Sequence, residues 1–152
     1  MLKTNKKGFT IIEVVLVLAI AGLIFLMVFI ALPALQRSQR DSQRRQDVSK
    51  VMSQLQSYQT NNRGSIPANH TALNNTNFSD NYLKRSAGEF KDPQTGNDYT
   101  FTNNTPSTAT MQYVVGQSCN GENFTTGTSK GSRVAAIRIK LEGSGFYCQD
   151  NQ

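Results

Sequence analysis

A long apolar stretch near the N-terminus constrains this chain more than any other feature. Phe9 to Leu32 is apolar apart from Thr10 and Glu13. As a helix rising about 1.5 Å per residue it would reach about 36 Å, enough to cross a bilayer core of about 30 Å. The flanking basic charge places the N-terminus on the cytoplasmic side; it comes from Lys3, Lys6 and Lys7.

Two simpler interpretations explain only part of this pattern. The apolar region of a secretory signal peptide is usually about 7–15 residues long and carries no early glutamate. A plain single-span anchor accounts for the length, but not for Gly8-Phe9 or Glu13. The sequence therefore favours a segment with a purpose besides anchoring.

Glu13 is the most informative residue of the stretch. A carboxylate costs about 2.5–3.5 kcal/mol at the membrane midplane, and less near the interface. The apolar span contains no basic partner for it. Cleavage after Gly8 would expose a free amine on Phe9, and Glu13 of one subunit could pair with that amine on another. Such a buried charge can set the register of an assembly.

This arrangement resembles the type IV prepilin and pseudopilin family: a basic leader ending in Gly8, then Phe9-Thr10-x-x-Glu13, then about twenty apolar residues. The resemblance implies that a membrane aspartic peptidase cuts after Gly8 and methylates the amine of Phe9. It also implies that Glu13 aids assembly by meeting a neighbour's N-terminus. The match is close over residues 1–35. The later segment 92–99, Asp-Pro-x-Thr-Gly-x-x-Tyr, also looks like one common in these proteins.

A single long helix, roughly residues 9–60, is the expected core of the fold. Gly22 and Pro33 are the candidate kink positions, since proline removes a backbone donor. The family's usual proline corresponds to Ile30, so any loss of helical order should be shifted along the chain. An apolar stripe at helical spacing predicts that the second half packs on a globular domain; it comprises Val48, Val51, Met52, Leu55 and Tyr58.

The C-terminal part reads as a small sheet. Runs typical of strands occur at 99–102, 110–116, 133–141 and 145–148, after a short helix predicted near Ser79 to Arg85. The connections are too short for crossover helices, which favours antiparallel pairing. Alternation places Ile137 and Ile139 on a buried face, and Arg138 and Lys140 on a solvated one. The predicted class is α+β, a pilin fold with about four antiparallel strands.

We therefore divide the chain into four parts. Residues 1–8 form the cleaved leader, 9–35 the transmembrane or filament-core half of the helix, 36–60 its amphipathic half, and 61–152 a globular β domain. The net charge of +6 belongs mostly to the leader and to residues 36–50, which we call the neck, because residues from Asn61 onward carry eight basic and seven acidic groups.

The neck charges leave several interpretations open. Phospholipid headgroups or a nucleic-acid backbone could meet them. A solvated helix face is simpler, and in a filament the arginines could pair with Asp41 and Asp47 of neighbours. The basic neck residues are Arg37, Arg40, Arg44, Arg45 and Lys50.

The remaining reactive residues give no pattern for catalysis. His70, the one histidine, lies in a polar loop, and the two cysteines are far from it in sequence. We predict no enzyme activity, no cofactor and no metal site. Two cysteines in an exported chain can remain free or form a disulfide. The family resemblance favours a Cys119–Cys148 disulfide.

These features predict a structural subunit, a major pilin, of a type IV pilus used in adhesion, twitching motility or DNA uptake. The alternatives are a pseudopilin of a type II-like secretion system, or a minor adhesive or DNA-binding pilin. The expected partners are copies of the chain, a prepilin peptidase, an assembly ATPase and a platform protein. The chain would lie in the cytoplasmic membrane before assembly and in an extracellular pilus afterwards.

Overall fold

The computed structural model describes residues 8–125 and 129–152. The chain divides into two compact units, Met1–Gln36 and Arg37–Gln152, and helix α1 (Ile11–Asn61) contributes to both. Most of the predicted leader, residues 1–7, lies outside the described residues.

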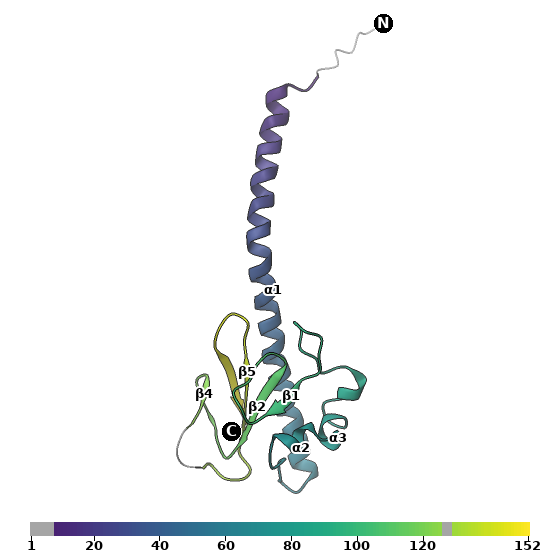
Figure 1. Ribbon diagram of the computed structural model, residues 1–152, viewed down its shortest axis with the longest axis vertical. Coiled ribbons are helices and arrows are strands. Elements are labelled where there is room, and N and C mark those ends of the chain that lie inside the picture. Colours follow the sequence, from purple (N-terminus) through teal and green to yellow (C-terminus); the bar gives the residue numbers. More distant parts are fainter. Residues whose placement is uncertain (1–7, 126–128) are drawn as a thin grey trace. The chain divides into compact units, whose positions relative to one another are not determined.

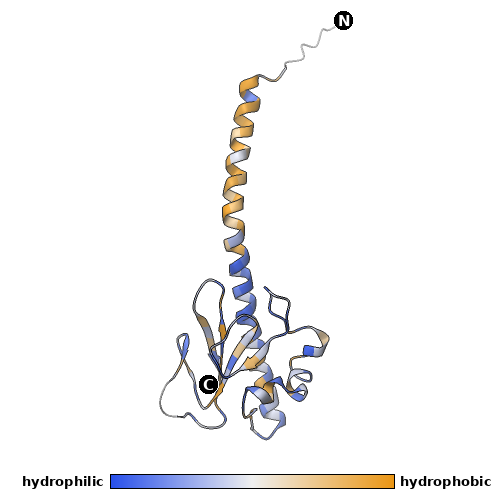
Figure 2. Ribbon diagram, in the orientation of Figure 1, coloured by the Kyte–Doolittle hydropathy of each residue, from blue (hydrophilic) through white to orange (hydrophobic). Residues whose placement is uncertain are grey.

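Helix α1 confirms the predicted long helix. It contains 51 residues and continues through both Gly22 and Pro33. A proline in a helix removes one hydrogen bond to the carbonyl four residues earlier, and the many remaining bonds keep the helix intact. A bend at either position stays a prediction. In the first unit the side chains of α1 are almost uniformly apolar, whereas the helix becomes polar after Leu35 (Figure 2).

The second unit combines the later half of α1 with short helices and two small sheets. Its elements after α1 are α2 (His70–Asn74), α3 (Thr76–Ser79), the 3-10 helix η1 (Arg85–Ala87), β1 (Thr100–Thr102), β2 (Thr110–Val115), β3 (Cys119–Asn120), β4 (Asn123–Phe124), β5 (Ala135–Lys140) and β6 (Phe146–Asp150). The strand runs expected from the sequence are confirmed within a few residues.

The short helix expected near Ser79 to Arg85 is wrong in position. Helices α2 and α3 come earlier and end by Ser79, and only η1 lies near Arg85. The side chains of Asn69 and Asn75 accept hydrogen bonds from the amides of Ala72 and Asn77. Asparagine is a strong N-cap residue, so these two asparagines determine where the helices begin.

The main sheet has the order β1-β2-β5-β6. Strands β2, β5 and β6 are antiparallel as predicted, but β1 runs parallel to β2, so the sheet is mixed. The prediction assumed that a parallel pair needs a helical crossover. Here β1 is only three residues long. At about 3.3 Å per residue, β1 is about 10 Å long. The loop of residues 103–109 can return the chain over this distance to begin β2 beside the start of β1, without a helix.

The core lies between α1 and the main sheet. Val48, Val51, Met52 and Leu55 of α1 are buried, as the stripe predicted, and Tyr58 packs against the same cluster half-buried. From the sheet the cluster receives Met111, Tyr113, Ile137 and Ile139. Burial of each such side chain contributes about 1.5–3 kcal/mol. This packing holds residues 40–58 of the helix against the sheet.

The β3–β4 hairpin lies against part of the opposite face of the sheet, beside β6. Cys119 and Cys148 form the disulfide that the family resemblance favours. The Arg138 guanidinium lies over the rings of Phe124 and Phe146, 5.0 and 4.5 Å from their centroids. Arg138 is therefore half-buried, not solvated as the alternation predicted. The Cys119–Cys148 disulfide stabilises the fold by about 3–4 kcal/mol in the loop-entropy model.

Candidate processing and assembly site

Glu13 caps the beginning of α1 in the uncut chain. Its Oε2 accepts hydrogen bonds from the backbone amide and the hydroxyl of Thr10, both at 3.3 Å. The Glu13 amide in turn donates to the Thr10 carbonyl at 3.1 Å. This is one half of a capping box, in which a glutamate at the third helical position satisfies the amide of the N-cap residue. The carboxylate has no basic partner in the span, as predicted, but it does have local hydrogen-bond donors on Thr10.

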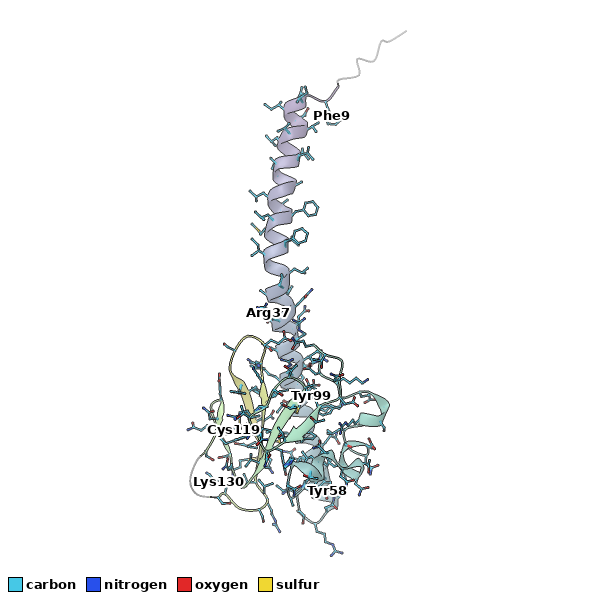
Figure 3. All side chains as sticks on the ribbon, in the orientation of Figure 1. Phe9, Arg37, Tyr58, Tyr99, Cys119 and Lys130 are labelled. Carbon is cyan, nitrogen blue, oxygen red and sulfur yellow. A yellow bond between two sulfur atoms is a disulfide. The ribbon has the colours of Figure 1, made fainter. Side chains whose placement is uncertain are left out.

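The peptide bond predicted to be cut lies just before the helix. Gly8 and Phe9 are exposed and non-helical, and 88% of the Phe9 surface is accessible (Figure 3). A Cβ built on Gly8 would meet no atom within 4 Å. The chain's own fold therefore imposes no requirement for glycine at this position. Such a requirement would come from an enzyme that binds this backbone.

The side chains of the first unit form an apolar surface on all sides of α1 (Figure 3). The large apolar side chains of residues 9–35 have between 47% and 88% of their surface exposed. A helix that is apolar all round is stable only in a membrane or buried among other elements. By length and composition this helix can cross a membrane.

A small apolar hollow on this surface is bordered by Glu13. It has a volume of about 290 Å³ and is lined by Phe9, Glu13, Val14, Val17 and Leu18. Residues three and four apart lie on the same face of a helix, so Glu13, Val14, Val17 and Leu18 form one continuous strip. Glu13 thus lies at the end of an apolar strip, next to the residue whose amine cleavage would release.

In the second unit, two of the neck arginines, Arg40 and Arg44, pair with residues of the globular part. The Arg44 side chain is only 3% exposed, and its Nε donates to Asp92 Oδ1 at 2.8 Å. Its two terminal nitrogens donate to the Lys140 carbonyl at 3.3 Å and to Gln94 Oε1 at 3.0 Å. Arg40 donates to both carboxylate oxygens of Glu142, at 2.6 and 2.7 Å. A solvated helix face is therefore the wrong description of Arg40 and Arg44.

The neck acids are also engaged within their own chain. Asp41 accepts from the amides of Glu142 and Gly143 at 2.7 and 3.2 Å, and Asp47 accepts from the Tyr99 hydroxyl at 3.1 Å. Pairing of Asp41 and Asp47 with arginines of neighbouring subunits, as expected from the sequence, would have to replace these contacts. The contacts instead attach the helix to its own globular unit.

The segment Asp92 to Tyr99 forms the other half of this attachment, which we call the neck clasp. Asp92 binds Arg44 and also accepts from the amide and hydroxyl of Thr95 at 3.0 Å each. Gly96 has a φ of 69°, a conformation that favours glycine. The Asp-Pro-x-Thr-Gly-x-x-Tyr pattern thus supplies an acceptor, a turn and a hydroxyl that together hold α1.

Two clasp carboxylates have pKa values shifted in opposite directions. Burial alone would raise the pKa of Asp92, but Arg44 and the Thr95 donors outweigh it and hold this pKa below its ordinary value. Burial raises the pKa of Asp47, against the opposing hydrogen bond from Tyr99. Burial, with Asp47 nearby, also raises the pKa of Tyr99, which stays a neutral donor. Asp92 is therefore the charge that the clasp stabilises.

His70 begins α2, and its ring lies 3.5 Å from the Thr71 hydroxyl. Within residues 8–125 and 129–152, no group of three or more His, Cys, Asp or Glu side chains could hold a metal ion.

A capped helix with an exposed apolar surface, joined to an α+β unit, fits the class of membrane-anchored precursors. Comparison with known proteins narrows this class. Residues 3–29 match the family model of the prokaryotic N-terminal methylation motif, the leader signature of type IV pilins and pseudopilins. The chain therefore carries the leader signature of these two classes of protein at its N-terminus. No curated protein and no solved structure matches it.

Proposed function

We propose that this chain is a structural subunit, a major pilin, of a type IV pilus filament. The observation that carries the proposal is the methylation motif placed at the start of an apolar helix whose surface is exposed on all sides. The leader implies processing by a prepilin peptidase. Cleavage after Gly8 leaves Phe9 as the first residue, with its new amine close to Glu13 along the chain.

Polymerisation would bury the same surface that first lies in the membrane. Leucine, isoleucine, valine and phenylalanine suit both lipid and helix–helix packing. Each apolar Å² kept out of water contributes about 25 cal/mol. A subunit that leaves the bilayer therefore needs the apolar helices of other subunits to cover the surface that lipid covered before. A contact between different patches of identical subunits, if it does not close into a ring, generates an open helical polymer. An assembly ATPase and a platform membrane protein are the expected partners.

The competing function is that of a pseudopilin in a type II-like secretion system, which shares this leader. The late acidic side chains favour the pilin. Glu122 accepts from the Phe146 amide, Glu142 from Arg40, and Asp150 from the Cys119 amide. These carboxylates hold the protein together instead of grouping as cation ligands. The near-neutral charge beyond Asn61 gives no support to a minor DNA-binding pilin.

Fibres sheared from cells that express the chain test this proposal. Electron microscopy should show abundant fibres, and N-terminal sequencing of their main component should begin at a methylated Phe9. A chain that is processed but absent from every extracellular fibre would point to the pseudopilin instead. An unprocessed chain would overturn both functions.

Gly8→Leu should leave an uncut precursor in the membrane. Because a Cβ at position 8 meets nothing within 4 Å, the variant should fold and insert as the unsubstituted chain does. Immunoblotting should show at least about tenfold less mature protein. A leucine that the peptidase cannot accommodate next to the cut bond would raise the activation free energy of cleavage by at least about 1.4 kcal/mol, which slows it tenfold. Gly22→Leu, the same change at another exposed glycine with open space, should be cut normally. Mature protein at the usual level from Gly8→Leu would refute the cleavage site.

A further inference from the structure

Three arginines on one face of α1 differ in how they are neutralised. Arg37, Arg40 and Arg44 are separated by three and four residues, so their side chains lie along one side of the helix. Arg44 pairs with the buried Asp92, and Arg40 with the largely buried Glu142. Among the residues that the structure describes, no carboxylate lies within ion-pair distance of Arg37. The series therefore has an anion at two positions and none at the third.

A polar hollow adjoins the unpaired arginine. It has a volume of about 380 Å³ and is lined by Arg37, Arg44, Gln94, Thr108, Lys140, Leu141 and Glu142. Arg44 is committed to Asp92, and Glu142 to Arg40. Lys140, like Arg37, is exposed and makes no ion pair within the described residues. The uncommitted charges of the hollow are thus two cations, with the Thr108 side chain beside them.

The position of Arg37 along the chain indicates what kind of anion it meets. Leu35 is the last residue of the apolar stretch, and Arg37 follows it by about 3 Å of helical rise. The headgroup layer of a bilayer adds about 5–8 Å to each side of the hydrocarbon core. With Leu35 at the edge of the hydrocarbon core, Arg37 would lie at phosphate depth, whereas Arg44, about 13 Å beyond Leu35, would lie past it. The two arginines that have protein partners are those farther from the lipid phosphates.

We propose that Arg37 and Lys140 bind the phosphate of a phospholipid headgroup in this hollow while the chain is anchored in the membrane. The lipid phosphate takes the place at Arg37 that Glu142 and Asp92 take at Arg40 and Arg44. Before assembly, this contact attaches the globular unit to lipid headgroups on the outer face of the cytoplasmic membrane. This inference rests on the membrane-anchored precursor of the proposed function, and on no property of the filament.

Amide chemical shifts of the full, uncut chain in dodecyl maltoside micelles test the site, because this detergent carries no phosphate. Short-chain phosphatidylglycerol should give saturable shifts at the amides of Thr108, Lys140 and Leu141. The double variant Arg37→Gln/Lys140→Gln should raise the dissociation constant for the lipid about 10- to 30-fold. Each basic residue near lipid contributes about a factor of five in affinity. Arg63→Gln, which removes a charge beyond the end of α1, should change it less than twofold.

Three results would overturn the proposal. One is saturation by inorganic phosphate at the same concentrations as the lipid, which would indicate a free-phosphate site. Another is a set of shifts that follows protein concentration instead of lipid, which would assign the hollow to a second copy of the chain. The last is lipid binding that the double variant leaves unchanged. The assay uses monomers in micelles, so none of these results bears on whether fibres form.

Discussion

Asp92→Ala is expected to lower the free energy of unfolding of the second unit by about 3–5 kcal/mol. The loss is large because Arg44 would remain buried at 3% exposure with its main counter-charge removed. Both Thr95 hydrogen bonds to the carboxylate would be lost as well. Asp92→Asn should cost nearly as much, because the amide keeps the shape but leaves the guanidinium uncompensated.

Near-ultraviolet circular dichroism during urea unfolding measures this change in the full chain. All five tyrosines lie in Arg37–Gln152, so the signal reports on the second unit while detergent holds the apolar helix. Asp98→Ala is the matched control. Asp98 is in the same segment, but its carboxylate is 41% exposed and 3.9 Å from Arg85. Exposed pairs contribute about 0–1 kcal/mol. Equal losses in Asp92→Ala and Asp98→Ala would refute the clasp.

The same comparison has a predicted pH dependence. The folded-state pKa of Asp92 is held below the ordinary value of 3.8, so its stabilisation is complete above that pH and is lost as the pH falls below it. The stability difference between the unsubstituted chain and Asp92→Asn should therefore shrink on going from pH 6 to pH 3. Asp47 has the opposite sign, because its raised pKa means that protonation relieves a cost. A constant difference across this range would contradict the assignment to Asp92.

The features predicted well from sequence are those that local patterns determine. The apolar run predicts α1, because a helix is one of few structures that satisfy the backbone hydrogen bonds of a segment in lipid. The alternation around Ile137 and Ile139 predicts β5. The Glu13 cap was missed although the signal was present: Thr10-x-x-Glu13 is a capping-box sequence. Glu13 is at once a charge within an apolar span and a capping residue, and the first property gives no indication of the second.

The features missed without any local signal depend on contacts between distant residues. Arg44 and Asp92 are 48 positions apart, and nothing near either residue indicates the other. Arg138 alternates like a solvated residue, but Phe124 of the hairpin and Phe146 of β6 cover its guanidinium. The parallel pairing of β1 follows from how short that strand is, and strand ends are poorly defined by sequence. The 92–99 segment is recognisable as a motif in the sequence. Its role as a clasp is not, because that role depends on contacts with α1 that only the folded chain makes.

Glu13→Val should be inserted and cut normally but should yield few or no fibres. Valine suits the apolar helix, so insertion becomes easier by up to about 2.5–3.5 kcal/mol. The lost carboxylate can no longer pair with the amine of a neighbouring Phe9. Leaving that amine unpaired among packed helices costs about 3–5 kcal/mol for each contact, enough for a fall of more than a hundredfold in assembly. Sheared-fibre yield, normalised to processed subunit in the membrane, measures it.

The Thr10 contact complicates this experiment, and Glu13→Gln separates the two explanations. Glutamine can still accept from the Thr10 amide, as a capping box allows, but it carries no charge for a neighbour's amine. If Glu13 acts by pairing, glutamine and valine should both abolish fibres. If it acts only as a helix cap, which contributes about 0.5–2 kcal/mol, glutamine should restore them. In the uncut chain the carboxylate is held by Thr10, so assembly would exchange a local cap for a contact between subunits. Fibres at the normal yield from Glu13→Gln would refute that exchange.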